Sequence, residues 1–546
     1  YAAAADLRMT ISDYNKLPAW ALGPAARSIE GVTAVAPIVR GPVDVGRAIR
    51  AGQLLAFDPA TAPALVNYSD DVAAATLPGL LGRLAEERTP TKSVPIDGSP
   101  LRLAVVVDAA ITADPAAFGP EEAVPLPPDW RGIDVTVFLE DADGRLHKVE
   151  GGSGLMSGDG QRIEVPLTRD VDGRRVAFPG PARLQGLELS FRMAAPQMVG
   201  IGTVDVLGVE ASDSESGDAD WRDIGWAPNA DGFHWTAVRF GPPGGFKPPP
   251  GQPGRIFFGF EPPATEPIFG GGGAVFRNST TPADPQHLPA IVGARFLELS
   301  GATVGEDVAA SLSGQRVTLA IIGVTDQFPS LDPTEPFAIV DATTLERSRQ
   351  ATTGQVVATK EWWLSVDPAA AQAVEDQLLS APIAATEVVG RASLTRSLAS
   401  DPVSLGIIGA LALGALAALV FASIGFIVSA TVTSSERVSE FAILRALGLS
   451  ARELSAWVSL ENAFLLVFGL IAGSLLGVVL SWLVLPFATL TETGEAAVPA
   501  PEIVVPWAAM APLYAGAGVL FVVTVAIVTR QVRRAGISTV LRSGED

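Results

Sequence analysis

The sequence predicts an α-helical membrane protein with a large extracytoplasmic α+β domain, which carries an inserted β-sandwich (jelly-roll-like) domain. Three observations lead to this fold class. Three long uncharged runs lie in the last quarter of the chain, the arginines of that quarter fall in two groups, and short alternating strand patterns fill the middle of the chain.

The three uncharged runs are long enough to cross a bilayer. They contain 34, 30 and 27 residues and lie between Asp401 and Glu436, between Glu461 and Glu492, and between Glu502 and Arg530. A helix needs ~20 apolar residues to span a hydrocarbon core. We therefore expect transmembrane helices at about 403–433, 456–489 and 504–530, within a membrane domain over 401–546.

The distribution of charge predicts the orientation of these helices. All seven arginines after residue 400 lie either in the connection between the first two runs or in the C-terminal tail. The connection between the second and third runs carries three glutamates and no base. Because positive loops stay inside, we expect the first connection and the C-terminus to be cytoplasmic and residues 1–400 to be extracytoplasmic. A domain of that size outside the membrane also predicts a transmembrane helix before Tyr1.

Composition disfavours several classes of function. Net charge is −21, of which −18 belongs to residues 1–400, and this argues against nucleic-acid binding. The chain has no cysteine and three histidines, so thiolate sites are excluded and a histidine-built metal centre is disfavoured. It also has no GxxxxGK[ST] phosphate loop. We expect no catalytic residue, no metal and no cofactor in this chain.

The charged connection over 434–449 predicts an amphipathic helix at the membrane face. Val438, Phe441 and Leu444 follow at helical spacing, with Arg437 and Glu440 on the polar side. The helix has two interpretations. It either only turns the chain at the interface, or it is a coupling helix that docks into a partner protein.

The ends of this helix are also encoded locally. Gly448 is expected to end it. Ser450 is expected to cap the next helix, ahead of Glu453.

Residues 437–448 resemble the signature R-x-x-E-[IF]-[AG]-x-L-[RK]-A-[LI]-G of FtsX-like, MacB-type ABC transporter permeases. The context is similar too: a DP-x-x-x-G-I entry at residue 401, an acid opening the second run, and an LR-x-G ending at residue 541. The resemblance covers about 145 residues and favours the coupling-helix interpretation. It implies ATPase-coupling roles for Glu436, Arg437, Glu440, Phe441, Leu444, Arg445, Ala446, Leu447 and Gly448.

The second run contains the candidate sites for packing within the membrane. Gly469, Gly473 and Gly477 form a small-residue ridge at a spacing of four, which permits close contact between helices. Glu461 lies near the start of the run and is either a paired group within the membrane or a group at the interface.

The resemblance implies a permease subunit of an ABC transporter in a bacterial cell (inner) membrane. ATP and Mg would be bound by a separate cytoplasmic ABC ATPase, present as a dimer. Further expected partners are a second permease half or a homodimer partner, membrane lipid, and an envelope or lipoprotein partner. The permease would export or extract a lipid, lipoprotein or peptide, or transmit mechanical motion. Two alternatives stay open: a membrane-anchored regulator of a cell-wall hydrolase, or a glycan-binding or adhesion surface protein.

The first 400 residues divide by pattern into four segments. Residues 1–95 and 286–400 resemble the two parts of a MacB-like core domain, 96–240 predict the inserted sandwich, and 241–285 predict a Pro/Gly-rich linker. Within the sandwich, DADG at 141–144 and VDG at 171–173 predict hairpin turns. In the second part of the core domain, residues 290–299 predict a strand.

Overall fold

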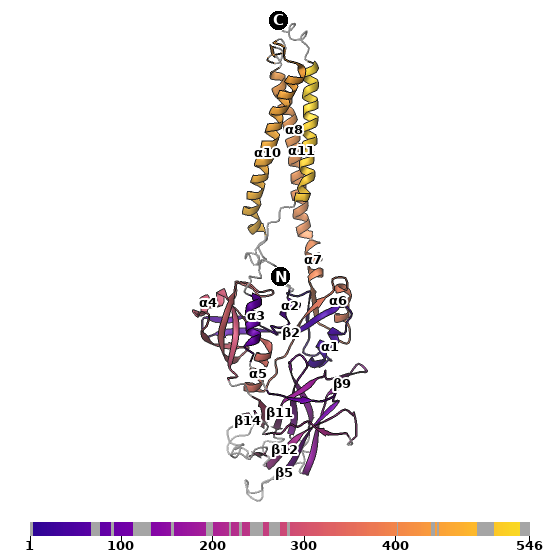
Figure 1. Ribbon diagram of the computed structural model, residues 1–546, viewed down its shortest axis with the longest axis vertical. Coiled ribbons are helices and arrows are strands. Elements are labelled where there is room, and N and C mark those ends of the chain that lie inside the picture. Colours follow the sequence, from indigo (N-terminus) through magenta and orange to yellow (C-terminus); the bar gives the residue numbers. More distant parts are fainter. Residues whose placement is uncertain are drawn as a thin grey trace, which may run out of the picture. The chain divides into compact units, whose positions relative to one another are not determined.

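The computed structural model separates the chain into two compact units, Tyr1–Thr395 and Arg396–Asp546 (Figure 1). We call them the N-terminal and the C-terminal unit. The structure describes residues 4–66, 77–88, 92–112, 133–153, 158–192, 200–217, 220–228, 232–240, 255–260, 273–280, 284–400, 402–437, 440, 443–444, 447–488 and 507–534.

A nine-stranded mixed sheet is built from the two ends of the N-terminal unit. Its order is β18-β19-β17-β20-β3-β2-β21-β1-β22, with β17–β19 and β20–β3 as parallel pairs. The strands are β1 (Leu7–Thr10), β2 (Val32–Val45), β3 (Ile49–Phe57), β17 (His287–Gly293), β18 (Asp307–Leu312), β19 (Gln315–Thr325), β20 (Phe337–Asp341), β21 (Glu361–Val366) and β22 (Glu387–Gly390). Segments far apart in sequence, such as those of Leu7 in β1 and Gly390 in β22, are therefore direct neighbours in one sheet.

This sheet buries apolar side chains on both faces, because successive residues of a strand point to opposite sides. Leu55 and Ile339 belong to a cluster with helix α3, whereas their neighbours Leu54 and Val340 belong to a second cluster with α4 and α5. The helices of the unit are α1 (Ala19–Arg27), α2 (Ala62–Leu65), α3 (Leu77–Glu86), α4 (Ala294–Ser300), α5 (Ala342–Thr353) and α6 (Ala371–Leu379). Helix α7 (Arg391–Ala399) spans the boundary between the two units.

Between the two halves of that sheet, the chain forms two antiparallel sheets. One has the order β14-β16-β11-β6-β7 with β4 on β11, and the other the order β13-β12-β5-β8 with β15 on β12. The first contains β4 (Val94–Ile96), β6 (Ile133–Glu140), β7 (Leu146–Ser153), β11 (Ala182–Arg192), β14 (Phe233–Phe240) and β16 (Gly273–Thr280). The second contains β5 (Arg102–Thr112), β8 (Gly158–Pro166), β12 (Gly200–Ser212), β13 (Arg222–Asp223) and β15 (Arg255–Phe260).

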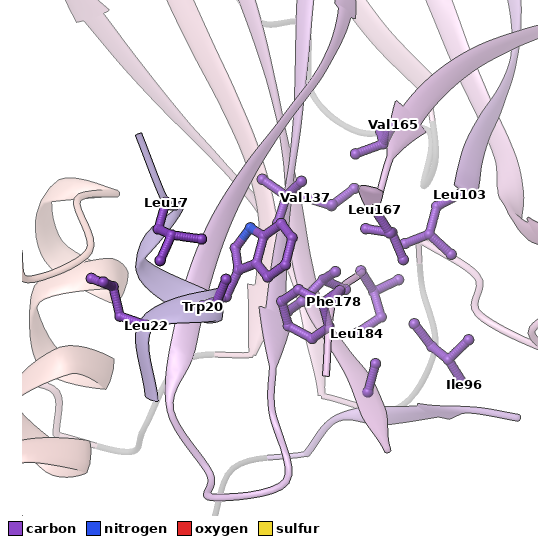
Figure 2. Close-up of a cluster of buried hydrophobic side chains, with 14 of the residues drawn as sticks. Leu17, Trp20, Leu22, Ile96, Leu103, Val137, Val165, Leu167, Phe178 and Leu184 are labelled. Carbon is purple, nitrogen blue, oxygen red and sulfur yellow. The ribbon is translucent and has the colours of Figure 1, made fainter. Parts of the chain in front are cut away.

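Buried side chains from both antiparallel sheets form one hydrophobic cluster, which continues into the nine-stranded part. Val137 of β6 and Val165 of β8 belong to it, together with Trp20 of α1. Figure 2 shows Trp20 lying beside Phe178, with ring centroids 5.6 Å apart. The two parts of the N-terminal unit therefore share a core.

The two hairpin turns are confirmed. β6 and β7 pair on either side of residues 141–144, where Gly144 has a φ of 75°. β9 (Thr168–Val171) pairs with β10 (Arg174–Ala177) around Gly173, whose φ is 76°. Both glycines occupy the left-handed region that such turns require.

Two expectations for this unit are wrong. The segment 241–285 is not a linker throughout, because 255–260 and 273–280 are strands that pair with β12, β11 and β14. The Pro/Gly content of the segment hid the alternating apolar residues that join the sheets. Residues 290–299 are not one strand either, because α4 follows β17 directly and Gly301, with a φ of 71°, caps it.

The C-terminal unit contains three long helices: α8 (Pro402–Glu436), α10 (Ala451–Ala488) and α11 (Trp507–Arg534). In Figure 1 they run side by side, and α11 contacts both others. Among the described residues, two stretches are long and apolar enough to span a membrane, Gly409–Thr433 and Arg452–Leu483, and Tyr514–Ile527 is a shorter apolar stretch. The three predicted helices thus exist, and α8 extends through 434–436, which were expected to open the next helix.

Candidate functional site

The connection from α8 to α10 is short and contains a helical turn that stops at a glycine. Leu447 N donates to Ile443 O at 3.0 Å, and Leu449 N donates to Leu444 O at 3.1 Å. Gly448 then adopts a φ of 101°, a conformation that favours glycine. The predicted stop at Gly448 is confirmed.

A capping box starts α10. Glu453 N donates to Ser450 Oγ at 3.3 Å, while Ser450 N donates back to Glu453 Oε2 at 2.8 Å. This reciprocal pair satisfies backbone donors that the first turn of a helix leaves free. The serine predicted as the cap therefore fixes where the connection ends.

The connection presents charged and apolar side chains to its surroundings. Glu436 and Glu440 are exposed, and so are Ile443, Leu444 and Leu447, the last at 76 %. Ile443 was missed at the sequence level because the i, i+3, i+6 count passed over it. Phe441, Arg445 and Ala446 lie outside the described residues.

Glu461 is paired with the connection. Arg437 Nη1 lies 3.3 Å from Glu461 Oε2, and both side chains are close to half exposed. Ala430 of α8 also packs against Leu454 and Val458 of α10 in a small buried cluster. The sequence left open whether this acid has a partner. The structure joins it to a residue of the predicted coupling set.

Among the described residues, the glycine ridge of α10 packs against no other helix. A Cβ atom built at Gly469, Gly473 or Gly477 would meet no atom of these residues within 4 Å. One contact between α10 and α11 is polar, since Ser474 Oγ lies 2.8 Å from Tyr514 Oη. Close packing at the ridge stays a prediction that requires a partner chain.

These features define a class: a membrane protein whose long apolar helices are joined by a short, charged connection and follow a large β-rich domain. Residues 395–537 match the family model of the FtsX-like permease C-terminal domain. The C-terminal part of the chain is therefore similar to FtsX-like ABC transporter permeases, in agreement with the FtsX-like resemblance of residues 437–448. A search of the curated proteins found no match. The FtsX-like family consists of permeases rather than enzymes.

Helix α5 of the N-terminal unit is a second concentration of charge. Its N-cap is Asp341, whose carboxylate accepts from Thr344 N at 2.8 Å and also binds Arg88. Burial by itself would lower the pKa of Arg88, but its hydrogen bonds to Asp341 and Asp58 raise it. Arg88 therefore stays charged and holds α5 to the loop after β3.

The middle of α5 binds the β6–β7 hairpin through buried ion pairs. Arg145 Nε donates to Glu346 Oε2 at 3.1 Å, and Leu146 N donates to the same oxygen at 3.3 Å. Next to it, Arg347 lies 3.6 Å from Glu140. Burial raises the pKa of Glu140 and lowers that of Arg347, and each charge partly opposes the shift of the other.

The end of α5 is covered by another ion pair of the antiparallel sheets. Arg277 donates to Glu188 at 2.8 and 3.0 Å, and both side chains are buried. The Arg277 guanidinium lies where a Cβ of Gly354, the α5 C-cap, would be. The antiparallel sheets are thus attached along α5 by paired charges.

Proposed function

We propose that this chain is the permease subunit of an ABC complex in which a separate cytoplasmic ATPase dimer binds ATP and Mg and docks on the connection between α8 and α10. ATP-driven closure of the ATPase would move α8 and α10, and these helices would carry the motion to the N-terminal unit. A helix can do this because its backbone hydrogen bonds are internal, so it moves as a rod in lipid.

The observation that carries this proposal is the family match together with the exposed connection inside it. Ile443, Leu444 and Leu447 are apolar yet exposed, and Glu436 and Glu440 flank them. Exposed apolar side chains rimmed by charge are typical of a protein interaction surface. The Arg437–Glu461 pair and the capping box hold both ends of this surface to α10, so a push on the connection reaches that helix.

The proposed topology has α8, α10 and α11 crossing a bacterial inner membrane, with the connection and C-terminus in the cytoplasm and residues 1–400 outside. The arginine distribution supports this orientation. The work done outside would be extraction or export of a lipid, lipoprotein or peptide, or a mechanical pull on an envelope partner. A second permease half or a second copy would complete the membrane domain and is the expected partner of the glycine ridge.

Docking is tested with the complex isolated from native membranes. Leu447→Asp introduces a charge at an exposed position, so the fold should be preserved. We expect at least a tenfold loss of co-purifying ATPase and of coupled ATP hydrolysis. Val304→Asp, at an exposed apolar side chain of the N-terminal unit, is the matched control. A charge-reversed Glu440→Lys, Arg445→Glu double variant should behave as Leu447→Asp does. Unchanged assembly and hydrolysis in both would refute docking at this connection.

Topology is tested by thiol labelling, which reports only on an introduced residue because the chain has no cysteine of its own. Leu447→Cys should react with a membrane-impermeant maleimide only after the membrane is opened. Tyr14→Cys, 94 % exposed in the N-terminal unit, should react in intact cells. The reverse pattern would contradict the proposed orientation.

A further inference from the structure

A cavity of about 640 Å³ lies inside the N-terminal unit, where the nine-stranded part meets the antiparallel sheets. Its walls come from α1, from the β6–β7 hairpin, and from the segment that leads into β21. Neither the family match nor the proposed docking surface involves it, since the match begins at residue 395.

One wall is a stretch of unpaired backbone. Residues 356–359 all line the cavity and form no helix, strand, turn or bend. Within the described residues, the backbone N–H and C=O groups of 356–359 make no hydrogen bond.

Another wall is the edge of a sheet. β7 pairs with β6 and, among the described strands, with no other, and residues 145–150 all line the cavity. Leu146 N points away from β6, because it donates to Glu346. In an antiparallel strand every second residue points its N–H and C=O the same way, so Lys148 and Glu150 also present theirs to the free edge.

The remaining lining suits a polypeptide. Trp20, Trp362 and four prolines supply apolar surface. Charges balance, with Arg27, Arg145, Lys148 and Arg169 against Asp141, Asp143, Glu150 and Glu346.

We propose that this cavity binds an extended peptide segment, which adds as a further strand to the free edge of β7 and faces residues 356–359. Strand addition uses main-chain hydrogen bonds for affinity and pockets for alternate side chains for specificity. A peptide backbone supplies carbonyl acceptors and amide donors at the same ~3.4 Å spacing as the two edges. The balanced lining favours a segment of low net charge.

This proposal goes beyond the proposed permease function and does not depend on it. ATPase docking concerns the connection between α8 and α10, whereas peptide binding requires only the N-terminal unit of the folded chain. If docking fails and peptides still bind, the peptide site stands. If peptides fail to bind while docking holds, the peptide site alone is refuted.

The experiment uses the full chain in nanodiscs and a random heptapeptide phage library. We expect peptides of alternating apolar residues to be enriched over empty nanodiscs and, once synthesised, to bind in fluorescence anisotropy. The same peptides N-methylated at alternate amides should bind at least tenfold more weakly, because main-chain pairing is lost. Equal affinity of the methylated peptides, or no enrichment at all, would overturn the proposal. Binding of the neutral sugar maltotriose in place of any peptide would overturn it as well.

Two substitutions test whether the peptide binds in this cavity. Glu150→Pro removes one outward N–H from an exposed edge residue, a position where proline is tolerated. We expect at least a tenfold loss of peptide affinity, while Glu150→Ala, which keeps the N–H, stays within twofold. As a second route, Ala19→Trp fills the cavity from an exposed position of α1 and should abolish binding, whereas Ser28→Trp, exposed but outside the cavity, should not. Unchanged binding in both Glu150→Pro and Ala19→Trp would rule out this cavity.

Discussion

The two units of the chain differ in what they bury: the N-terminal unit buries ion pairs, whereas the C-terminal unit exposes its ion pair and its large apolar side chains. The N-terminal unit buries ion pairs such as Arg145–Glu346 and Arg277–Glu188 between its parts. In the C-terminal unit the Arg437–Glu461 pair is close to half exposed, and large apolar side chains such as Phe421 and Leu476 cover the outside of the helices.

The difference follows from the solvent each unit is built for. A unit in water joins its layers with charges only where every charge is paired, because an unpaired buried charge is costly. Helices in lipid gain nothing by hiding apolar side chains, so they display them and keep charge at their ends. Buried pairs in the N-terminal unit should therefore contribute far more to the free energy of unfolding than the exposed pair in the C-terminal unit. The following predictions test that contrast.

The largest effect is expected for Glu346→Gln. The substitution leaves the Arg145 guanidinium buried without its counter-charge, so we expect the N-terminal unit to lose ~3–5 kcal/mol of unfolding free energy. Denaturant unfolding followed by tryptophan fluorescence measures it. The double variant Arg145→Met, Glu346→Leu should recover most of the loss. A single-variant loss below ~1 kcal/mol, as for an exposed pair, would break the contrast.

A pair of glycine variants tests whether the buried Arg277–Glu188 pair stabilises the N-terminal unit. Gly354 and Gly301 both cap helices with a φ of 71°, but a Cβ at Gly354 would overlap Arg277, whereas at Gly301 it would meet nothing within 4 Å. Gly301→Ala should cost about 1–2 kcal/mol from the left-handed backbone alone. Gly354→Ala should cost roughly 1–3 kcal/mol more, because it displaces the buried Arg277 from Glu188. Equal losses of unfolding free energy in the two variants would show that the Arg277–Glu188 pair does not help to hold the antiparallel sheets to α5.

A smaller effect is expected at the exposed start of α10. Ser450→Ala removes the acceptor for Glu453 N, and a lost N-cap typically costs about 1 kcal/mol of helix stability. Amide hydrogen exchange over the first turn of α10 should speed up accordingly. Ser450→Asp keeps an acceptor and should leave exchange nearly unchanged. If both variants exchanged alike, the capping box would not set this helix boundary.

The smallest effect is expected for the exposed ion pair. A double-mutant cycle of Arg437→Gln and Glu461→Gln should give a coupling of ~0.2–1 kcal/mol, as for other exposed pairs. Thermal unfolding of the C-terminal unit in nanodiscs provides the measurement. A coupling above ~2 kcal/mol would mean that lipid or a partner buries the pair, and the contrast between the units would then fail at this point.

Much of the membrane site could be predicted because its determinants are local. The stop at Gly448 and the cap at Ser450 depend on hydrogen bonds over three to five residues, and such bonds can be anticipated from residue types. The partner of Glu461 could not, because Arg437 reaches it from 24 residues away across the fold of α8 onto α10. The exposure of Ile443 likewise depends on how the turn is oriented.

The strands at 255–260 and 273–280 show the opposite case. Each contains one glycine, but both lie among segments rich in proline and glycine, so the composition of 241–285 as a whole predicts a linker. They are strands because β12, β11 and β14 offer edges to pair with. Strand propensity depends on the neighbouring strands more than on the segment itself.

By itself, the sequence determined the uncharged helices, the turns and caps that bound them, and the family of the membrane part, since each rests on residues within one short window. Only the tertiary structure decided which charges pair and which strand edges stay free. Arg145 and Glu346 are 201 residues apart, and the edge of β7 borders the same cavity as residues 356–359, which lie a similar distance away in the chain. Such contacts depend on how whole sheets pack, and no local pattern encodes that.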